Sequence, residues 1–162
     1  MLATLTKSNN EFIATFERSF DQPVEKVWAV LTRNDQLAKW MSHLEIKEMG
    51  KDGLIIFNYN DGSGQSEKMK ITDFEDLSVI EFEWGKDIVR FEVHPTGTGT
   101  LLILKEFIKE LTDHTPKDLA GWHMCLNIFE HVVNNVESQL PDNNEWEKWY
   151  DEYKKIVANT DK

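Results

Sequence analysis

The chain has 162 residues, of which 40% are hydrophobic and 11% aromatic, a composition typical of one globular domain with a sizeable core. Its 29 acidic and 18 basic residues give a net charge of −11, which disfavours nucleic acid and anionic membranes as partners. A single cysteine excludes an internal disulfide, and no apolar run approaches the length of a membrane span, so we expect a cytoplasmic protein.

The first 40 residues predict a tail, one strand and two short helices. Residues 1–10 are polar without periodicity and predict a flexible tail. Residues 11–20, EFIATFERSF, alternate as a half-buried strand does. The period then becomes helical over residues 23–33, with Pro23 in the first turn, and residues 34–40, NDQLAKW, predict a second short helix.

The middle of the chain returns to period two, broken by turn-forming stretches such as NDGSGQ and PTGTG. The predicted strands are 44–49, 54–59, 67–74, 79–84, 88–94 and 100–111. Six consecutive strands joined by tight turns predict an antiparallel meander, and the N-terminal strand makes seven. Val89, Phe91 and Val93 point to one face while Arg90 and Glu92 point to the other, so we expect one covered and one solvated face.

The covering element is a predicted helix that begins at Thr115 and ends before Pro141. Its apolar stripe recurs at spacings of three and four: Leu119, Trp122, Leu126, Phe129, Val133, Val136 and Leu140. These elements place one domain at residues 11–140. Residues 141–162 add a shorter, aromatic-rich helix that we expect to pack on the same domain.

The long helix carries the cysteine and two of the five histidines, and a third, His114, directly precedes it, but their spacing does not favour chemistry. Cys125 and His131 point about 120° apart on a helix, so they do not form a nucleophilic dyad. His and Cys residues do not recur at i and i+4, and the chain has no CxxC pair, so no metal is predicted. No nucleotide-binding glycine pattern is present either, and we predict neither catalytic residues nor a cofactor.

Two polar residues remain as candidate pocket groups. His123 lies on a flank of the long helix, where it either faces solvent or leans into the edge of a pocket. Glu106 points inward if Leu102 and Leu104 do, and outward if Leu101 and Ile103 are the buried residues. The sequence leaves both questions open.

Three stretches resemble a known family: PVEKVWAVLTRNDQLAKWM from residue 23, DGLIIFNYNDGSG from residue 52 and GWHMCLNIFEHVV from residue 121. They resemble bacterial proteins related to the C-terminal domain of the activator of Hsp-90 ATPase, in the START-like or SRPBCC superfamily. The likeness covers roughly residues 11–140. The aromatic C-terminal helix departs from the pattern, and the resemblance gives it no role.

The resemblance implies the α+β helix-grip fold: a curved antiparallel sheet of about seven strands around a long C-terminal helix, with two short helices and, here, an extra one. It also implies an apolar cavity between sheet and helix. Expected ligand-binding residues are Phe57, Tyr59, Met69, Phe82, Trp84, Phe91, Trp122, Leu126 and Phe129. The alternative is that the same residues fill a packed core, and periodicity does not distinguish the two.

The leading hypothesis is therefore non-catalytic binding of a small hydrophobic molecule, aromatic or lipid-like. The resemblance supplies an alternative, a stress-response co-chaperone that contacts a chaperone or another protein. A third hypothesis is a cyclase or hydrolase like others in the superfamily, for which Glu106 or His123 would be the acid or base. We expect a monomer or weak homodimer.

Overall fold

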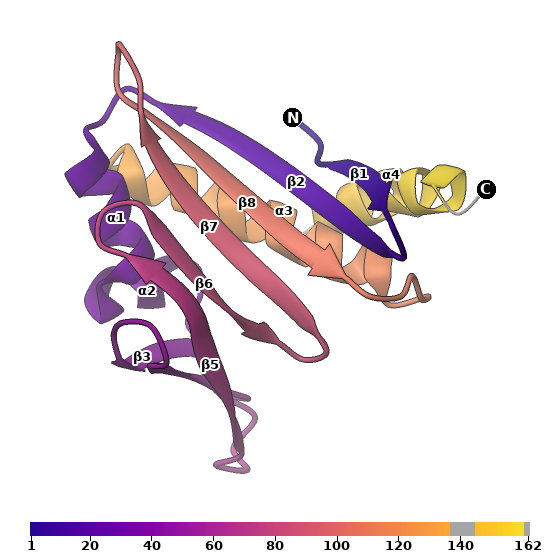
Figure 1. The fold of residues 1–162 in the computed structure, drawn as a ribbon, viewed down its shortest axis with the longest axis horizontal. Helices are drawn as coiled ribbons and strands as arrows, with labels where there is room; N and C mark the ends of the chain where they lie inside the picture. The colour runs from indigo at the N-terminus through magenta and orange to yellow at the C-terminus, as the bar shows by residue number, and fades with distance from the viewer. Residues whose placement is uncertain (137–144, 161–162) are drawn as a thin grey trace.

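The computed structural model describes residues 1–136 and 145–160. One antiparallel sheet of eight strands runs in the order β1-β2-β8-β7-β6-β5-β4-β3, and helices cover one of its faces (Figure 1). The strands are β1 Thr4–Ser8, β2 Glu11–Phe20, β3 Leu44–Glu48, β4 Leu54–Asn58, β5 Ser66–Glu75, β6 Val79–Trp84, β7 Asp87–Pro95 and β8 Thr100–Ile108. The helices are α1 Val24–Thr32, α2 Asn34–Trp40, α3 Thr115–Val133 and α4 Glu145–Thr160.

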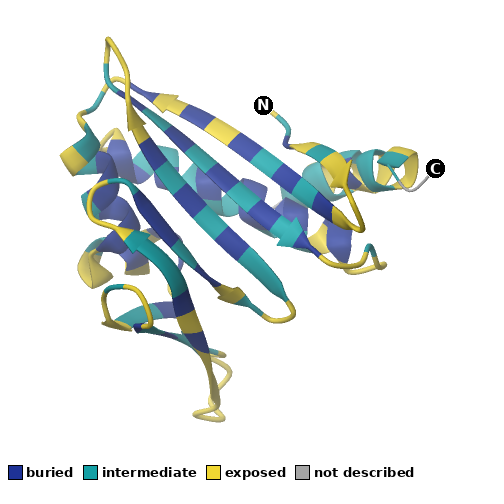
Figure 2. Cartoon of the chain, viewed as in Figure 1, coloured by how far each residue is buried: buried dark blue, intermediate teal, exposed yellow. Residues whose placement is uncertain are grey.

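The six-stranded meander and the helix-grip fold are confirmed. Strands β3 to β8 follow one another in both sequence and space, and β2 closes the sheet against β8. Buried and half-buried residues alternate along β7 and β8, because successive side chains point to opposite faces of a strand (Figure 2). This alternation directs one apolar row of each strand toward α3.

The N-terminus differs from the flexible tail expected over residues 1–10. Thr4–Ser8 form β1, which pairs with β2 through a hairpin whose turn residue Asn9 takes a positive φ of 57°. The hydroxyl of Tyr153 in α4 accepts a hydrogen bond from the backbone N–H of Ala3 at 3.0 Å. β1 is mostly exposed, so a helix far along the chain contributes to ordering a segment that has no hydrophobic periodicity of its own.

The long helix is shorter than expected, because α3 ends at Val133. Asn135 adopts a left-handed φ of 59° and its N–H donates to the carbonyl of Val132, while the N–H of Val136 donates to that of His131. These two bonds form a Schellman motif, in which Asn substitutes for the more usual Gly. Val136 is consequently exposed rather than part of the buried stripe, and Leu140 and Pro141 lie outside the described residues.

The core lies between the sheet and the helices α1 to α3. Trp40 of α2 illustrates the packing: its ring meets Phe91 of β7 and Phe129 of α3, with centroids 6.1 and 5.1 Å away. Its indole N–H donates to the carbonyl of Val30 in α1 at 2.9 Å, which satisfies a polar group that burial would otherwise penalise. Within the described residues, no helix is both long and apolar enough to span a membrane.

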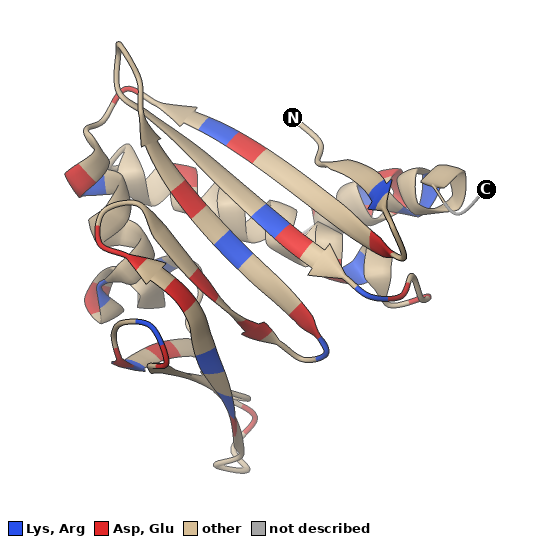
Figure 3. Ribbon diagram, in the orientation of Figure 1, with Lys and Arg blue, Asp and Glu red and all other residues tan. Residues whose placement is uncertain are grey.

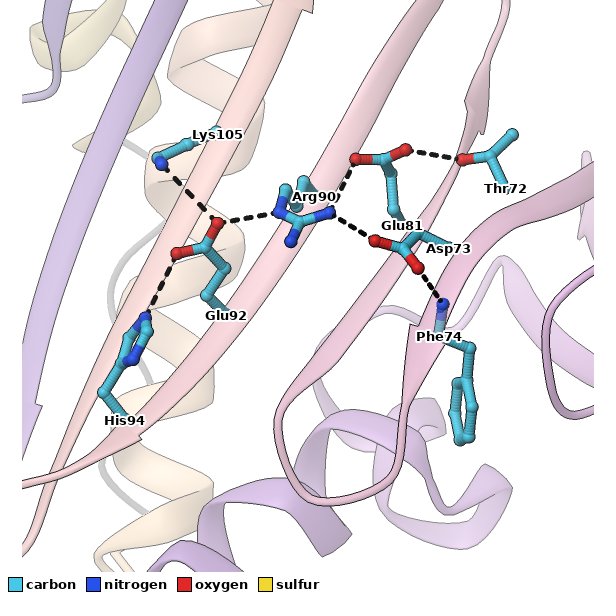
Figure 4. Close-up of polar contacts among 8 residues, drawn as sticks. All are labelled: Thr72, Asp73, Phe74, Glu81, Arg90, Glu92, His94 and Lys105. Atoms are coloured by element: carbon cyan, nitrogen blue, oxygen red, sulfur yellow. Dashed lines mark hydrogen bonds and ion pairs between the residues drawn. The ribbon is translucent and has the colours of Figure 1, made fainter.

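The other face of the sheet is open and charged, with acidic and basic residues interspersed along the strands (Figure 3). Arg90 lies at its centre and contacts Glu92 at 2.7 Å, Asp73 at 2.9 Å and Glu81 at 3.0 Å (Figure 4). Burial alone would raise the pKa of Glu92, but hydrogen bonds from Arg90 and His94 outweigh it and lower the pKa to about 2. This ion-pair network connects β5, β6 and β7 on the side away from the helices.

Candidate functional site

The centre of the interior, between the sheet and the helices, is filled. The space bounded by Leu31, Trp40, Phe82, Phe91 and neighbouring residues holds only about 10 Å³, roughly what one water molecule needs. Four of the predicted lining residues are buried in this packed region or beside it: Phe82, Phe91, Leu126 and Phe129. They act as core residues here.

A larger hollow lies between the first half of α3 and the ends of β4 and β6. It measures about 250 Å³, and three predicted residues line it, Phe57, Trp84 and Trp122. Their rings contact one another, with centroids 4.9 Å apart for Trp84 and Trp122 and 5.7 Å apart for Phe57 and Trp84. Three of the nine predicted residues therefore lie together on one side of this hollow.

Gly121 also lines this hollow, one residue before Trp122. A Cβ built on Gly121 would meet no neighbouring atom within 4 Å. A side chain at this position would therefore project into space that is open, and the absence of a side chain there keeps the hollow wide.

A second cleft continues beyond Trp84 and is lined by the end of β8, the turn between β6 and β7 and the start of α3. Figure 1 shows that the β6–β7 turn and the end of β8 lie at the same end of the sheet. It measures about 480 Å³ and shares Trp84, His114 and Asp118 with the hollow. The indole N–H of Trp84 donates to Oδ1 of Asp118 at 3.2 Å. This hydrogen-bonded pair stands between an aromatic compartment and a more polar one.

The structure settles the register of β8 and directs Glu106 into the interior. Thr100, Leu102, Leu104, Glu106 and Ile108 form the buried row of the strand. Glu106 is completely buried and lines the cleft, and its carboxyl group meets no N–H or hydroxyl donor among the described residues, so its polar partner there is the carboxyl group of Asp118. Burial raises the pKa of Glu106 well above its usual range, and the hydrogen bond with Asp118 and the negative charges of Asp118 and Asp87 raise it further.

Asp118 and Asp87 complete an acidic group that sequence reasoning missed. In the sequence alone Asp118 is one acidic residue near the start of a helix, although its spacing of four from Trp122 places both on one face of α3. Asp87 begins β7 and accepts a hydrogen bond from the backbone N–H of Lys109 at 3.1 Å. Burial raises its pKa as well, with the charge of Asp118 contributing.

His123, the other candidate pocket group, faces α4 and not the hollow. Its ring stacks on Trp149 with centroids 3.9 Å apart, and its Nδ1 lies 2.7 Å from the hydroxyl of Tyr153. Burial lowers the pKa of His123 to about 3, and the charge of Arg18 lowers it further. A histidine that stays neutral and enclosed by aromatic rings holds α4 against α3.

The remaining predicted residues lie outside both spaces. Met69 is buried in β5, and Tyr59 lies at the surface, where its hydroxyl donates to the carboxylate of Glu67. Cys125 does line the hollow, but burial of its thiol and the charge of Asp118 raise its pKa to about 12, so it is not a reactive thiolate. Across residues 1–136 and 145–160, no three His, Cys, Asp or Glu side chains gather in a way that could hold a metal ion.

Comparison with known proteins identifies the family. Residues 21–134 match the family described as Activator of Hsp90 ATPase homolog 1-like protein, and the chain belongs to it. This confirms the resemblance drawn from the three sequence stretches. A search of curated proteins found no match.

Solved structures show the same fold. The conserved protein of unknown function EF2215 from Enterococcus faecalis has a TM-score of 0.87 at 26% identity, covering 98% of this chain and 91% of that one. CalU16 from Micromonospora echinospora has a TM-score of 0.72 at 18% identity, covering 98% and 96%. MLL2253 from Mesorhizobium loti has a TM-score of 0.67 at 18% identity, covering 76% and 98%. The first two matches extend over nearly the whole chain.

Proposed function

We propose that this protein binds a small hydrophobic molecule, aromatic or lipid-like, without transforming it, in the hollow between α3 and the sheet. The observation that carries the proposal is the hollow of about 250 Å³ lined by Phe57, Trp84 and Trp122, together with the cleft that continues from it. Small-molecule sites are concave, mainly apolar and furnished with a few placed polar groups, and this pair of spaces matches that description.

The position of the site follows from where the interior is packed. The middle of α3 contributes Leu126 and Phe129 to a core without space for a ligand, whereas its first turns leave room beside Gly121 and Trp122. We therefore assign binding to the start of α3, and not to the whole length of the helix. A charged substitution at Phe129 would test folding and not binding.

Gly121 provides the direct test. In the Gly121→Leu variant the new side chain would start from a Cβ that meets no neighbouring atom and extend beside the hollow, so we expect the fold to persist while binding is lost. The Gly121→Ala variant adds one methyl group and serves as the matched control, which should still bind. Amide-shift NMR titrations of both variants with a ligand that binds the wild type measure this. Unchanged binding by a folded Gly121→Leu variant would contradict the proposed location.

A second candidate function is contact with a protein partner, a chaperone above all, and membership of the Activator of Hsp90 ATPase homolog 1-like family favours it. A shared family does not by itself transfer a partner. The test is association of the purified protein with the Hsp90 homologue of its own organism, measured by analytical ultracentrifugation. No complex at micromolar concentrations would count against this function and leave ligand binding unaffected.

A further inference from the structure

Extending the proposed function, on which this inference rests, we propose that the bound molecule is an organic amine: a flat apolar group held in the hollow and a cationic nitrogen held in the cleft between Glu106 and Asp118. The two spaces share Trp84 and Asp118, so one molecule can occupy both.

The charge of the cleft favours a cation. Its lining contains four acidic residues, Asp87, Glu106, Glu110 and Asp118, and two lysines, Lys86 and Lys109. The whole chain carries a net charge of −11, which attracts cations from a distance. An anionic ligand would meet this excess of carboxyl groups and a buried acid without compensation.

Glu106 identifies the position of the nitrogen. Its carboxyl group is fully buried, lines the cleft and meets no N–H or hydroxyl donor among the described residues, so in the free protein its polar partner is the carboxyl group of Asp118, with which it shares a proton. An ammonium group supplies three N–H donors and a positive charge, and so could satisfy Glu106 and Asp118 together. Binding of an amine would thus replace the proton shared by the two acids with charge-assisted hydrogen bonds to both carboxylates.

The aromatic side of the site fits the same ligand. Trp84 contacts Trp122 at a centroid distance of 4.9 Å, and its N–H is directed at Asp118. A flat apolar group can pack against these indoles, and an ammonium beside them gains further from the negative faces of the rings. Sites that combine aromatic rings with carboxylates are well suited to organic cations.

Binding of a cation should release a proton. In the free protein Glu106 holds its proton to a higher pH than an ordinary glutamate, and an ammonium at 3 Å or so favours the ionised carboxylate instead. Other charged or titratable groups face this region from each neighbouring element: Glu11 on β2, Lys86 and Asp87 at the turn before β7, Lys109 and Glu110 after β8, and His114, Lys117, Asp118 and Cys125 on or next to α3.

The test uses tryptamine and its neutral counterpart indole-3-ethanol, which differ in carrying an ammonium or a hydroxyl group on the same indole. We expect tryptamine to bind at least about tenfold more tightly, and calorimetry in two buffers of different ionisation enthalpy to show proton release at about pH 5, where Glu106 in the free protein still holds its proton. At pH values below the pKa of Glu106, the affinity for tryptamine should increase about tenfold for each unit by which the pH is raised. Equal affinities, or tryptamine binding without proton release, would overturn the inference.

Two variants test whether Glu106 and Asp118 cause the preference for tryptamine. Glu106→Gln should abolish proton release and bring the affinities of the two compounds close together, and Asp118→Asn, which retains an acceptor for Trp84, should lower the preference for tryptamine independently. The control is Glu48→Gln on an exposed position of β3, expected to behave as wild type. If the Glu106 variant does not fold, the Asp118 variant decides alone.

The outcomes separate this inference from the proposed function. Binding of indole-3-ethanol as tightly as tryptamine would support the hydrophobic site of the proposed function and contradict the inference that the ligand is an amine. Binding of neither compound, with NMR shifts at Trp84 and Trp122 from a steroid-like or fatty-acid pool, would also support a hydrophobic site and contradict the amine. If no compound binds, both the proposed function and this inference are contradicted.

Discussion

Trp84, the last residue of β6, donates its indole N–H to the carboxylate of Asp118 in the first turn of α3. The two residues are 34 positions apart, and their hydrogen bond joins the sheet to the helix at the point where the two hollow spaces meet. Burial raises the pKa of Glu106 and of Cys125, and the same carboxylate raises both further. One side chain therefore links the aromatic wall, the buried acid and the start of the long helix.

Removing the donor of this bond should destabilise the fold modestly. Trp84→Phe retains an aromatic ring but leaves Asp118 without its N–H partner, and the expected loss in free energy of unfolding is about 1.5 kcal/mol. Urea denaturation measures it. Asp118→Asn, which can still accept the bond, should lose less; a larger loss in that variant would show that the charge, and not the hydrogen bond, holds the two elements together.

Gly121→Ala should stabilise the protein. The methyl group meets nothing within 4 Å, and alanine is the better helix former because glycine has more backbone freedom to lose on folding. We expect a gain of about 0.5–1 kcal/mol in the free energy of unfolding. Thermal and urea denaturation both report it. A destabilised variant would mean that the space beside Gly121 is closed in solution.

Burial of His123 makes stability fall in mildly acidic solution. Its pKa is about 3 in the folded protein against an ordinary value of 6.5, so between these values the unfolded chain binds the extra proton. This group contributes a loss of about 1.4 kcal/mol per pH unit as the pH falls below about 6.5. Comparing urea denaturation of the wild type and His123→Gln at several pH values isolates it, because the variant lacks this slope.

Glu106 acts in the opposite direction. Its folded pKa is raised, so the folded protein binds the extra proton, and stability falls as the pH rises above the ordinary value of about 4.5 toward the folded pKa. Glu106→Gln should therefore gain stability relative to the wild type as the pH is raised from 5 to about 8. A constant difference between the two proteins over this range would mean that Glu106 ionises freely.

Glu92 on the open face contributes at lower pH. Its pKa is about 2 when folded against an ordinary value of 4.5, so its stabilisation is complete above about 4.5 and is lost as the pH falls toward 2. Glu92→Gln should be less stable than the wild type at pH 7, and the two should converge near pH 2. A difference that persists near pH 2 would show that the loss in the variant does not come from the charge of Glu92.

The strands were predictable because each carries a strong local pattern. The period-two runs gave β3 to β8 to within about two residues at most ends, with β8 the exception, ending at Ile108 instead of residue 111. β1 was not predicted because it is mostly exposed and so has no hydrophobic alternation. The hydrogen bond that holds its start, between Ala3 and Tyr153, involves a residue of α4. The end of α3 was predicted too late in the chain because the apolar spacing continues beyond Asn135, whose left-handed conformation terminates the helix.

The site was predictable in part. Phe57, Trp84 and Trp122 were expected together, and the structure brings them into contact. The direction of Glu106 was not predictable, because β8 has apolar residues in both of its rows, so alternation does not indicate which row faces the core. Asp118 was not predicted as a site residue because an acidic residue in the first turn of a helix is adequately explained by the helix dipole alone.

The central claim is that the space beside the start of α3 binds a small apolar molecule. The most direct measurement is an amide-shift NMR titration of the wild type against pooled flavonoid-like, fatty-acid, steroid-like and indole-amine compounds. We predict shifts that cluster on Phe57, Trp84, Gly121 and Trp122, with Phe129 in the packed core far less affected. No shift from any pool, or shifts clustered on the open face around Arg90, would contradict the claim.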